Sequence, residues 1–272
     1  MLSSFPLTLH VFAGIMVNSE KQRVLITAGA SGIGKAMAEA LEASGSLVWV
    51  VDTDEEALGK CPQSWQCDCV DVTNATGIES LFSRIDNTWG GLDVLCNNAG
   101  IAGPTAPIEE QPLDGIRNCL DVTLIGSFLC LKGALPIMKR QQHGVVIFTS
   151  STAGIHGFSL RAPYAAAKCG LQGLMKTVAI EGGPFGIRSN VIAPGAVEGP
   201  RVDAVIEKQA TARGVRPETI RKAYTDATSM RTFVSAEEIA DMAVFLSSKA
   251  AKNISGQIIA VDGHTENGDP KV

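Results

Sequence analysis

Short continuous apolar runs alternate along this chain with longer stretches in which apolar residues recur every three or four positions. The runs at 23–26, 46–51, 92–96 and 145–151 have the length and apolar character of buried strands. Residues 35–43 are alanine-rich and show helical spacing instead. Because parallel strands are joined through helices, this alternation predicts an α/β fold with a parallel sheet and right-handed crossovers.

A single domain is expected over residues 21–272. The chain of 272 residues is long enough for one sizeable core, and it contains no internal repeat, low-complexity tract or linker. Residues 1–15 are apolar, but they have no basic leader and are too short to span a bilayer. We therefore expect residues 1–20 to be a disordered extension or the product of an upstream start codon, with a signal peptide as the alternative.

Composition narrows the classes of partner. A net charge of −5 and a pI near 5.4, without a basic stripe, disfavour a nucleic-acid partner. The only cysteine cluster is Cys61, Cys67 and Cys69, and no histidine lies near it to complete a zinc set. We expect a cytoplasmic protein with reduced thiols, no metal, no membrane partner and a small-molecule substrate.

A glycine-rich segment, 27–34, connects the first predicted strand to the first predicted helix. Strand, glycine turn and helix together form the context of a dinucleotide-binding loop, because glycines admit the pyrophosphate and the helix N-terminus offers free N–H groups. A glycine-rich loop of another α/β protein is the alternative. The residues expected to contact the dinucleotide are Gly29, Ser31, Gly32, Ile33 and Gly34.

Asp52 ends the second predicted strand, eighteen residues after Gly34. A carboxylate there can accept hydrogen bonds from both adenosine ribose hydroxyls and would repel a 2′-phosphate. Neither Ser31 nor Thr53 offers a basic group to such a phosphate. The sequence therefore favours NAD over NADP, and the alternative is that Asp52 is only a turn residue.

Tyr164 and Lys168 are four residues apart, so they share one face of a helix. An ammonium there stabilises a phenolate and lowers a pKa that is normally near 10, which makes the tyrosine an acid/base catalyst at neutral pH. Ser151 lies thirteen residues upstream of Tyr164. A solvated helix face is the alternative for the pair, and a strand-end serine bonded to backbone is the alternative for Ser151.

Taken in order, these motifs resemble those of the short-chain dehydrogenase/reductase family from about residue 21 to residue 263. Within the family, the chain resembles the NAD-preferring branches that are polyol-dehydrogenase-like or 3-oxoacyl-reductase-like. The resemblance implies a single-domain Rossmann fold, with a doubly wound parallel sheet of about seven strands flanked by helices. It also implies that Tyr164 is the acid/base, that Lys168 binds the nicotinamide ribose as well, and that Ser151 donates to the substrate oxygen. Further cofactor contacts implied by matching segments are Asp71, Val72, Asn98, Ala99, Gly100, Pro194, Gly195 and Val197.

Three positions depart from the family pattern. Ala28 replaces the first glycine of the loop, and Gly199 replaces a threonine expected to contact the nicotinamide carboxamide. Thr123 stands where the family has an asparagine that holds a proton-relay water. A threonine hydroxyl can still bind a water, so we assign Thr123 to the catalytic group.

Residues 198–232 correspond to the substrate lid of the family. Arg201 in this segment, with His156 and Arg161 between Ser151 and Tyr164, are the candidate substrate contacts. An arginine there could bind a carboxylate, phosphate or sulfonate, or it could be an exposed surface arginine. An anionic substrate and a neutral polyol, sugar or secondary alcohol therefore both remain open.

The expected activity is NAD(H)-dependent interconversion of a secondary alcohol and a ketone. A 3-oxoacyl reductase is the alternative among enzymes, although it typically favours NADPH and a basic docking surface for the acyl carrier. A non-catalytic dinucleotide-sensing regulator is the alternative from another class. By resemblance we expect a homotetramer, or a homodimer, built through helices at 114–138 and 164–181.

Overall fold

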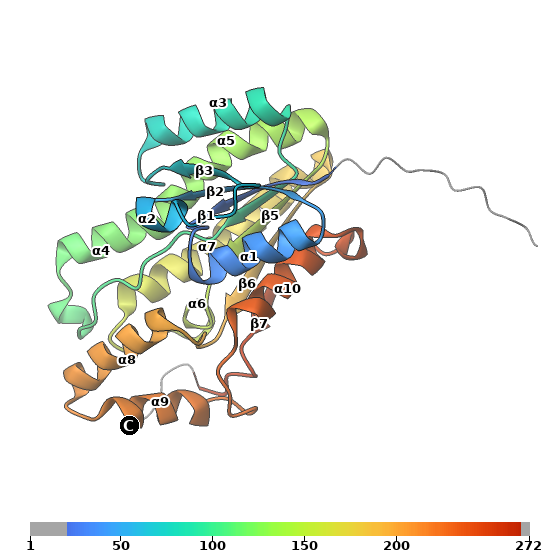
Figure 1. Ribbon diagram of the computed structural model, residues 1–272. Coiled ribbons are helices and arrows are strands. Elements are labelled where there is room, and N and C mark those ends of the chain that lie inside the picture. The colour runs from blue at the N-terminus through green and yellow to red at the C-terminus, as the bar shows by residue number, and fades with distance from the viewer. Residues whose placement is uncertain (1–20, 268–272) are drawn as a thin grey trace, which may run out of the picture.

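A computed structural model describes residues 21–267 (Figure 1). Its centre is a seven-stranded sheet in the order β3-β2-β1-β4-β5-β6-β7, with every neighbouring pair parallel. The strands are β1 (Arg23–Thr27), β2 (Leu47–Asp52), β3 (Gln66–Cys69), β4 (Val94–Asn97), β5 (Gly144–Thr149), β6 (Ile187–Pro194) and β7 (Ile258–Val261). The predicted doubly wound parallel sheet is confirmed.

Helices cover both faces of the sheet (Figure 1). On one face lie α1 (Gly32–Ala43) and α10 (Ala236–Ser247), and on the other lie α3 (Ala75–Trp89), α5 (Gly126–Gln141) and α7 (Ala162–Gly182). The remaining helices are α2 (Glu55–Leu58), α4 (Leu113–Leu120), α6 (Ala153–His156), α8 (Pro200–Arg213), α9 (Pro217–Asp226) and the short η1 (Ile108–Glu110), η2 (Asp121–Ile125), η3 (Gly183–Phe185) and η4 (Lys249–Ala251).

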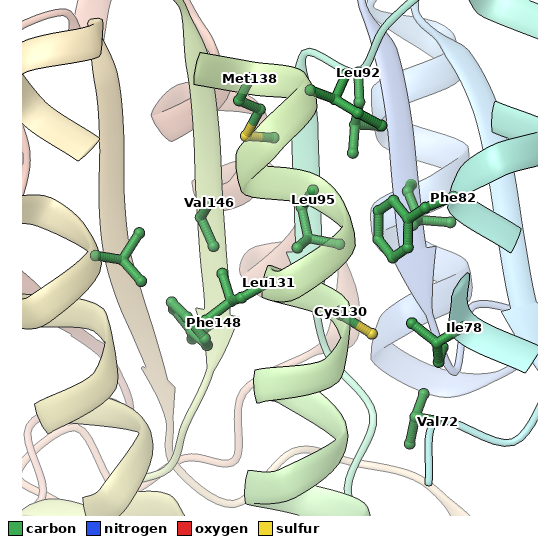
Figure 2. Packing of buried hydrophobic residues seen from close by; sticks show 14 of the residues in the cluster. Val72, Ile78, Phe82, Leu92, Leu95, Cys130, Leu131, Met138, Val146 and Phe148 are labelled. Carbon is green, nitrogen blue, oxygen red and sulfur yellow. The ribbon is translucent and has the colours of Figure 1, made fainter. Parts of the chain in front are cut away.

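The two faces of the sheet are both covered by helices, which explains why the apolar runs of the strands are continuous. Successive side chains of a strand point to opposite faces, so a strand covered on both sides has no solvent-facing position. Leu25 of β1 packs in the cluster under α3, α5 and α7, whereas its neighbours Val24 and Ile26 pack under α1 and α10. Figure 2 shows the first cluster, in which Leu131 of α5 lies against Phe148 of β5.

The helical stretch Leu113–Gln141, 29 residues long, has the length and composition of a membrane-spanning helix, because an 18-residue window within it has a mean hydropathy of 1.6. Leu131 and Met138, however, are buried in the core cluster against the sheet. A π-helical turn, η2, interrupts this stretch. The sequence pattern did not indicate this turn, and such turns often occur at functional sites.

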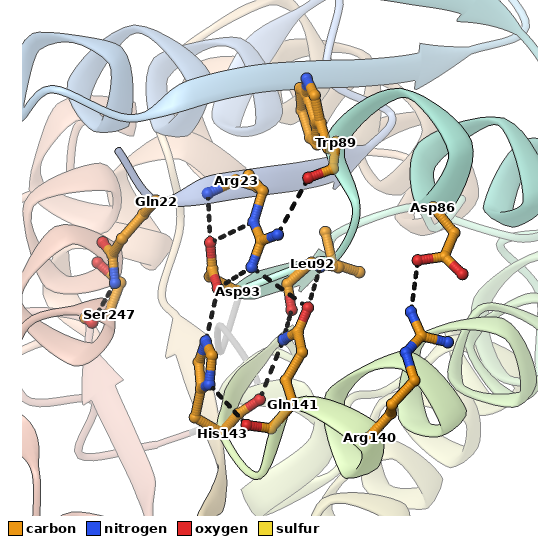
Figure 3. A network of polar contacts seen from close by, with 10 residues as sticks. All are labelled: Gln22, Arg23, Asp86, Trp89, Leu92, Asp93, Arg140, Gln141, His143 and Ser247. Atoms are coloured by element: carbon orange, nitrogen blue, oxygen red, sulfur yellow. Dashed lines mark hydrogen bonds and ion pairs between the residues drawn. The ribbon is translucent and has the colours of Figure 1, made fainter. Parts of the chain in front are cut away.

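Polar side chains join β1, β4 and α5 where the two strands begin (Figure 3). Arg23 donates to both oxygens of Asp93 at 2.8 Å, and Gln141 of α5 bonds to the backbone of Leu92. Burial raises the pKa of Asp93, but the hydrogen bonds from Arg23 and His143 outweigh it and the pKa is lowered. The network joins the N-terminal ends of the central strands β1 and β4 to α5. The candidate site lies at the opposite, C-terminal ends of the strands.

The segment predicted as the substrate lid forms α8 and α9, which lie away from the two helix layers (Figure 1). Val202, Ile206, Ala210 and Ile220 form a small apolar cluster between these two helices. The predicted extension at residues 1–20 lies outside the described part of the chain.

Candidate active site

A pocket of about 430 Å³ opens at the carboxyl ends of the strands, where ligands of open α/β sheets bind. It lies between the glycine-rich loop, the end of β5, the start of α7 and the lid helix α8. The predicted site residues that line it are Ser31, Gly32, Ile33, Asn98, Gly100, Ser151, Arg161, Tyr164, Lys168, Pro194, Gly195, Val197 and Arg201. The predicted residues outside its lining are Gly29, Gly34, Asp52, Asp71, Val72, Ala99, Thr123 and His156.

The glycines of the loop have different roles. Gly32 has φ +51°, and a Cβ built on it would meet no atom within 4 Å, so the backbone is open to a ligand at the start of α1. A Cβ on Gly29 would lie 2.7 Å from a methyl of Val50. A Cβ on Gly34 would clash with the carbonyl of Ala28 and lie 2.7 Å from Asn98. Gly32 can therefore cradle a phosphate, while Gly29 and Gly34 allow close packing of the loop.

Ala28 has φ +50°, the left-handed conformation that costs an alanine about 1–2 kcal/mol. Asn98 Nδ2 donates to the carbonyls of Thr27 and Ala28 at 3.1 and 3.2 Å, and this pair of bonds holds the turn. The conformation explains why glycine is the usual residue here. The alanine does not displace the loop from the pocket, because Ala28 itself lines it.

Gly199, the second departure, has φ +134° directly before α8, a conformation that side chains rarely adopt. The backbone here therefore favours glycine over the expected threonine.

Asp52 lies at the end of β2 beside the glycine-rich loop. Its carboxylate accepts from the backbone N–H of Ala30 at 3.2 Å and of Thr53 at 2.8 Å, which fixes its orientation. Asp71 follows the neighbouring strand β3 and is exposed, with its carboxylate accepting from Thr73. Val72 is buried against Gly126. Both aspartates thus stand at the same end of adjacent strands.

Ser151, Tyr164 and Lys168 meet in the pocket. The Lys168 ammonium is buried, donates to the carbonyl of Thr149 at 2.6 Å and lies 5.8 Å from the centre of the Tyr164 ring. The Ser151 hydroxyl accepts from the Ala153 N–H at 3.1 Å, so its own hydrogen can be donated to Tyr164 or to a bound ligand. The three side chains can therefore act on one bound oxygen.

The electrostatics of this group suit proton transfer. Burial raises the pKa of Tyr164, but Lys168, Arg201 and Arg161, together with a hydrogen bond from Ser151, outweigh burial and lower it to about 8. Burial lowers the pKa of Lys168, but the negative charge of the Tyr164 phenolate opposes that shift and favours the charged ammonium. A tyrosine with this pKa exchanges its proton near physiological pH.

Thr123 lies in the π turn η2 and is fully buried. Its hydroxyl lies beside the Cys119 thiol, and among residues 21–267 its oxygen has no other partner. A Cβ built on Gly100 would lie 3.2 Å from this oxygen and 3.1 Å from Lys168 Nζ. The two polar groups therefore border the same point beside Gly100. A water held there would connect them, since buried waters usually satisfy polar atoms of this kind.

Aromatic residues that sequence reasoning missed line the lid side of the pocket. Phe158 stacks on Tyr224 of α9 with ring centres 6.0 Å apart, and Tyr224 lies 6.2 Å from Phe233. The Arg161 guanidinium lies over the Tyr164 ring, 4.1 Å from its centre. No periodicity connects Tyr224 to Tyr164, because only the placement of α9 brings them together. His156, by contrast, is exposed at the end of α6 and does not line the pocket.

Known proteins resemble the chain over nearly its whole length. The family model described as enoyl-(acyl carrier protein) reductase matches residues 27–264. The chain belongs to the short-chain dehydrogenase/reductase family. Levodione reductase of Leifsonia aquatica is 34% identical over 252 residues, which cover 88% of this chain and 92% of that protein. D-beta-hydroxybutyrate dehydrogenase of Rhizobium meliloti (strain 1021) is 30% identical over 249 residues, 88% of this chain and 96% of that one.

The crystal structure of NAD⁺-bound xylitol dehydrogenase superposes with a TM-score of 0.86 at 26% identity, over 88% of this short-chain dehydrogenase/reductase and 97% of that chain. The resemblance named from the sequence motifs is thereby confirmed. The protein is an oxidoreductase of the type that acts on secondary alcohols and ketones with a nicotinamide dinucleotide.

The residues of this short-chain dehydrogenase/reductase fit such a cofactor. Gly32 leaves open space at a helix N-terminus for a pyrophosphate, and the buried Lys168 lines the same pocket, where it could meet a ribose. Pro194 and Gly195 line the wall after β6. The pocket thus contains both a phosphate cradle and the acid/base group.

Proposed function

We propose that this protein is an NAD(H)-dependent dehydrogenase that interconverts a secondary alcohol and its ketone. The observation that carries the proposal is the meeting of Ser151, Tyr164 and Lys168 in the pocket that also contains the Gly32 cradle. The lowered pKa of Tyr164, about 8, supports its assignment as the acid/base. As in the sequence-based expectation, the substrate is a polyol, sugar or hydroxy acid.

In the direction of oxidation, the Tyr164 phenolate takes the proton of the alcohol hydroxyl, and the cationic Lys168 stabilises that phenolate. The Ser151 hydroxyl donates to the same substrate oxygen and stabilises its developing charge. The nicotinamide, when bound, supplies the acceptor or donor of the hydride. The lid helices α8 and α9 are proposed to cover the substrate and exclude water.

Asp52 is proposed to select NAD. Asp52→Ala should weaken NAD binding by about 1.5–3 kcal/mol, because charge-assisted hydrogen bonds to the ribose are lost. It should also relax discrimination against NADP, since the repulsion of a 2′-phosphate is gone. Calorimetric titration of both dinucleotides measures the two effects. Asp54→Ala, which removes an exposed carboxylate from the same turn, is the control. An unchanged NAD/NADP preference in Asp52→Ala would show that another residue reads the ribose.

Thr123 is proposed to hold a relay water between Lys168 and solvent. Thr123→Val keeps the shape but removes the hydroxyl, so turnover should fall by about tenfold or more while NAD affinity and folding stay close to the parent. Thr123→Ser, which keeps the hydroxyl, is the matched control, and Thr123→Asn should preserve activity if the turn accepts the amide. Steady-state rates of the parent and the variants from pH 6 to 10 show whether turnover depends on the Thr123 hydroxyl. A valine profile that overlays the parent profile would exclude the relay.

A reduction assay with NAD and NADP across a panel of secondary alcohols tests the proposed activity. Oxidation of at least one alcohol with NAD preferred is the expected result. Failure with every alcohol despite tight NAD binding would instead favour a dinucleotide-sensing regulator. A preference for NADPH and acyl-carrier thioesters would favour a 3-oxoacyl reductase.

A cytoplasmic homotetramer, or a homodimer, is proposed for the assembly. On the two helices expected to form this contact, Leu131, Leu171 and Met175 are buried and pack on the sheet. Phe128 on α5 and Ile180 on α7 remain 46% and 76% exposed. These outward apolar side chains are the ones available for contact between copies, and sedimentation would report the oligomeric state.

A further inference from the structure

The charges that line the pocket do not balance. Within residues 21–267, the charged side chains of its lining are Arg161, Lys168, Glu198 and Arg201. Glu198 is engaged by Arg221 of α9, whose guanidinium donates to both carboxylate oxygens at 3.2 and 3.3 Å. The one acidic group of the lining is therefore offset by Arg221, a cation outside the lining. Within residues 21–267, the three cations of the lining have no carboxylate of their own.

Arg161 is the unusual member of this group. Only 8% of its surface is exposed, and its Nε has no partner among residues 21–267. Its terminal N–H groups meet only neutral acceptors there, the carbonyl of Ala102 at 3.3 Å and the Tyr224 hydroxyl. Its guanidinium lies 4.1 Å from the centre of the Tyr164 ring and 5.7 Å from that of Phe158. A buried guanidinium without a counter-anion is costly, so a fold retains one where a ligand supplies the negative charge.

Arg201 approaches the same point from the lid. It occupies the second position of α8, where the helix dipole is positive and disfavours a cation. It forms no ion pair with any described residue, and its charge acts on Tyr164 together with that of Arg161. At the start of α8, the positive end of the helix dipole and the charge of Arg201 therefore both favour binding of an anion.

We infer that the substrate is a short hydroxy acid whose carboxylate is bound by Arg161 and Arg201 while Tyr164 acts on its hydroxyl. The inference rests on the proposed alcohol dehydrogenase activity. Because the Arg161 guanidinium lies directly over the Tyr164 ring, the carboxylate must be only a few bonds from the reacting carbon. Phe158 and Tyr224 form the apolar wall against which the carbon chain packs.

Matched pairs of substrates test the inference. The probes are lactate, 3-hydroxybutyrate and 4-hydroxypentanoate, each compared with its methyl ester in the plateau of the pH profile. The parent should use at least one acid with a kcat/KM at least about tenfold above that of its ester. Arg161→Gln and Arg201→Gln should each remove most of that preference by lowering kcat/KM for the acid, and Arg161→Lys should restore part of it. Arg216→Gln, a lid arginine outside the pocket lining, is the control.

Calorimetric titration of butyrate into the enzyme–NAD complex provides a readout independent of turnover. Arg161→Gln should raise its Kd by about tenfold. If esters or neutral alcohols are oxidised as well as the acids, or if Arg161→Gln leaves the acid preference intact, the inference is wrong and the proposed activity stands. If no alcohol is oxidised, yet butyrate binds in an Arg161-dependent manner, the anion site stands and the proposed activity is wrong. If the acids are not preferred over their esters and butyrate binding does not depend on Arg161, the inference is wrong.

Discussion

Replacing Tyr164 by phenylalanine should lower turnover by about 10²- to 10⁴-fold, the usual contribution of a general acid/base. The ring remains, so the stacking of Arg161 and the packing of the pocket are preserved. NAD affinity should therefore stay close to that of the parent, because only the proton acceptor is lost. Single-turnover rates with saturating NAD, together with a calorimetric Kd for NAD, separate the two quantities.

The chain provides its own control for this substitution. It contains two tyrosines, and the other, Tyr224, also lines the pocket. Burial raises the pKa of Tyr224, partly offset by Arg161 and Gln209, so this hydroxyl stays protonated over the range in which Tyr164 titrates. Tyr224→Phe should leave the inflection of the pH profile in place even if substrate affinity changes. Near-normal turnover in Tyr164→Phe would remove the proposed mechanism.

Lys168→Ala should damage both catalysis and cofactor binding. Turnover should fall by about 10²- to 10³-fold, as for other charged groups that stabilise a transition state. The pH at which alcohol oxidation is half-maximal should rise from about 8 towards 10, because the burial of Tyr164 would then meet less opposing positive charge. Steady-state rates over pH 6 to 10 and calorimetry with NAD measure the two effects.

Lys176→Ala is the matched control, since Lys176 is exposed on the same helix, α7. It should leave the pH profile and NAD affinity unchanged. A Lys168→Ala profile that keeps its inflection near 8 would show that Lys168 does not control the Tyr164 pKa.

The parts of the fold with local patterns were predictable from the sequence. Continuous apolar runs such as that containing Leu25 indicate strands buried on both faces, and their alternation with helices determines the parallel sheet. The spacing of Tyr164 and Lys168 likewise follows from one helix. These features were predictable because they depend on residues that are close in sequence, or on strands whose order is limited by the connections between them.

Other features depend on tertiary placement and could not be predicted. The left-handed conformation of Ala28 and the π turn around Thr123 have no signal in residue type, because each is held by contacts with distant segments. The stacking of Phe158 on Tyr224 depends on where α9 lies. The sequence placed Arg161 and His156 in one candidate group, and only the structure separates the buried arginine from the exposed histidine.

The pH dependence of alcohol oxidation tests the central claim most directly. The Tyr164 phenolate is the proposed base, and its pKa of about 8 lies below the ordinary value of 10. The kcat/KM for oxidation should therefore rise with pH and level off above about 8, while kcat/KM for ketone reduction, which needs the protonated phenol, should fall through the same pH. Both inflections should be absent from the residual activity of Tyr164→Phe. A profile that is flat from pH 6 to 10, or one that Tyr164→Phe reproduces, would contradict the account.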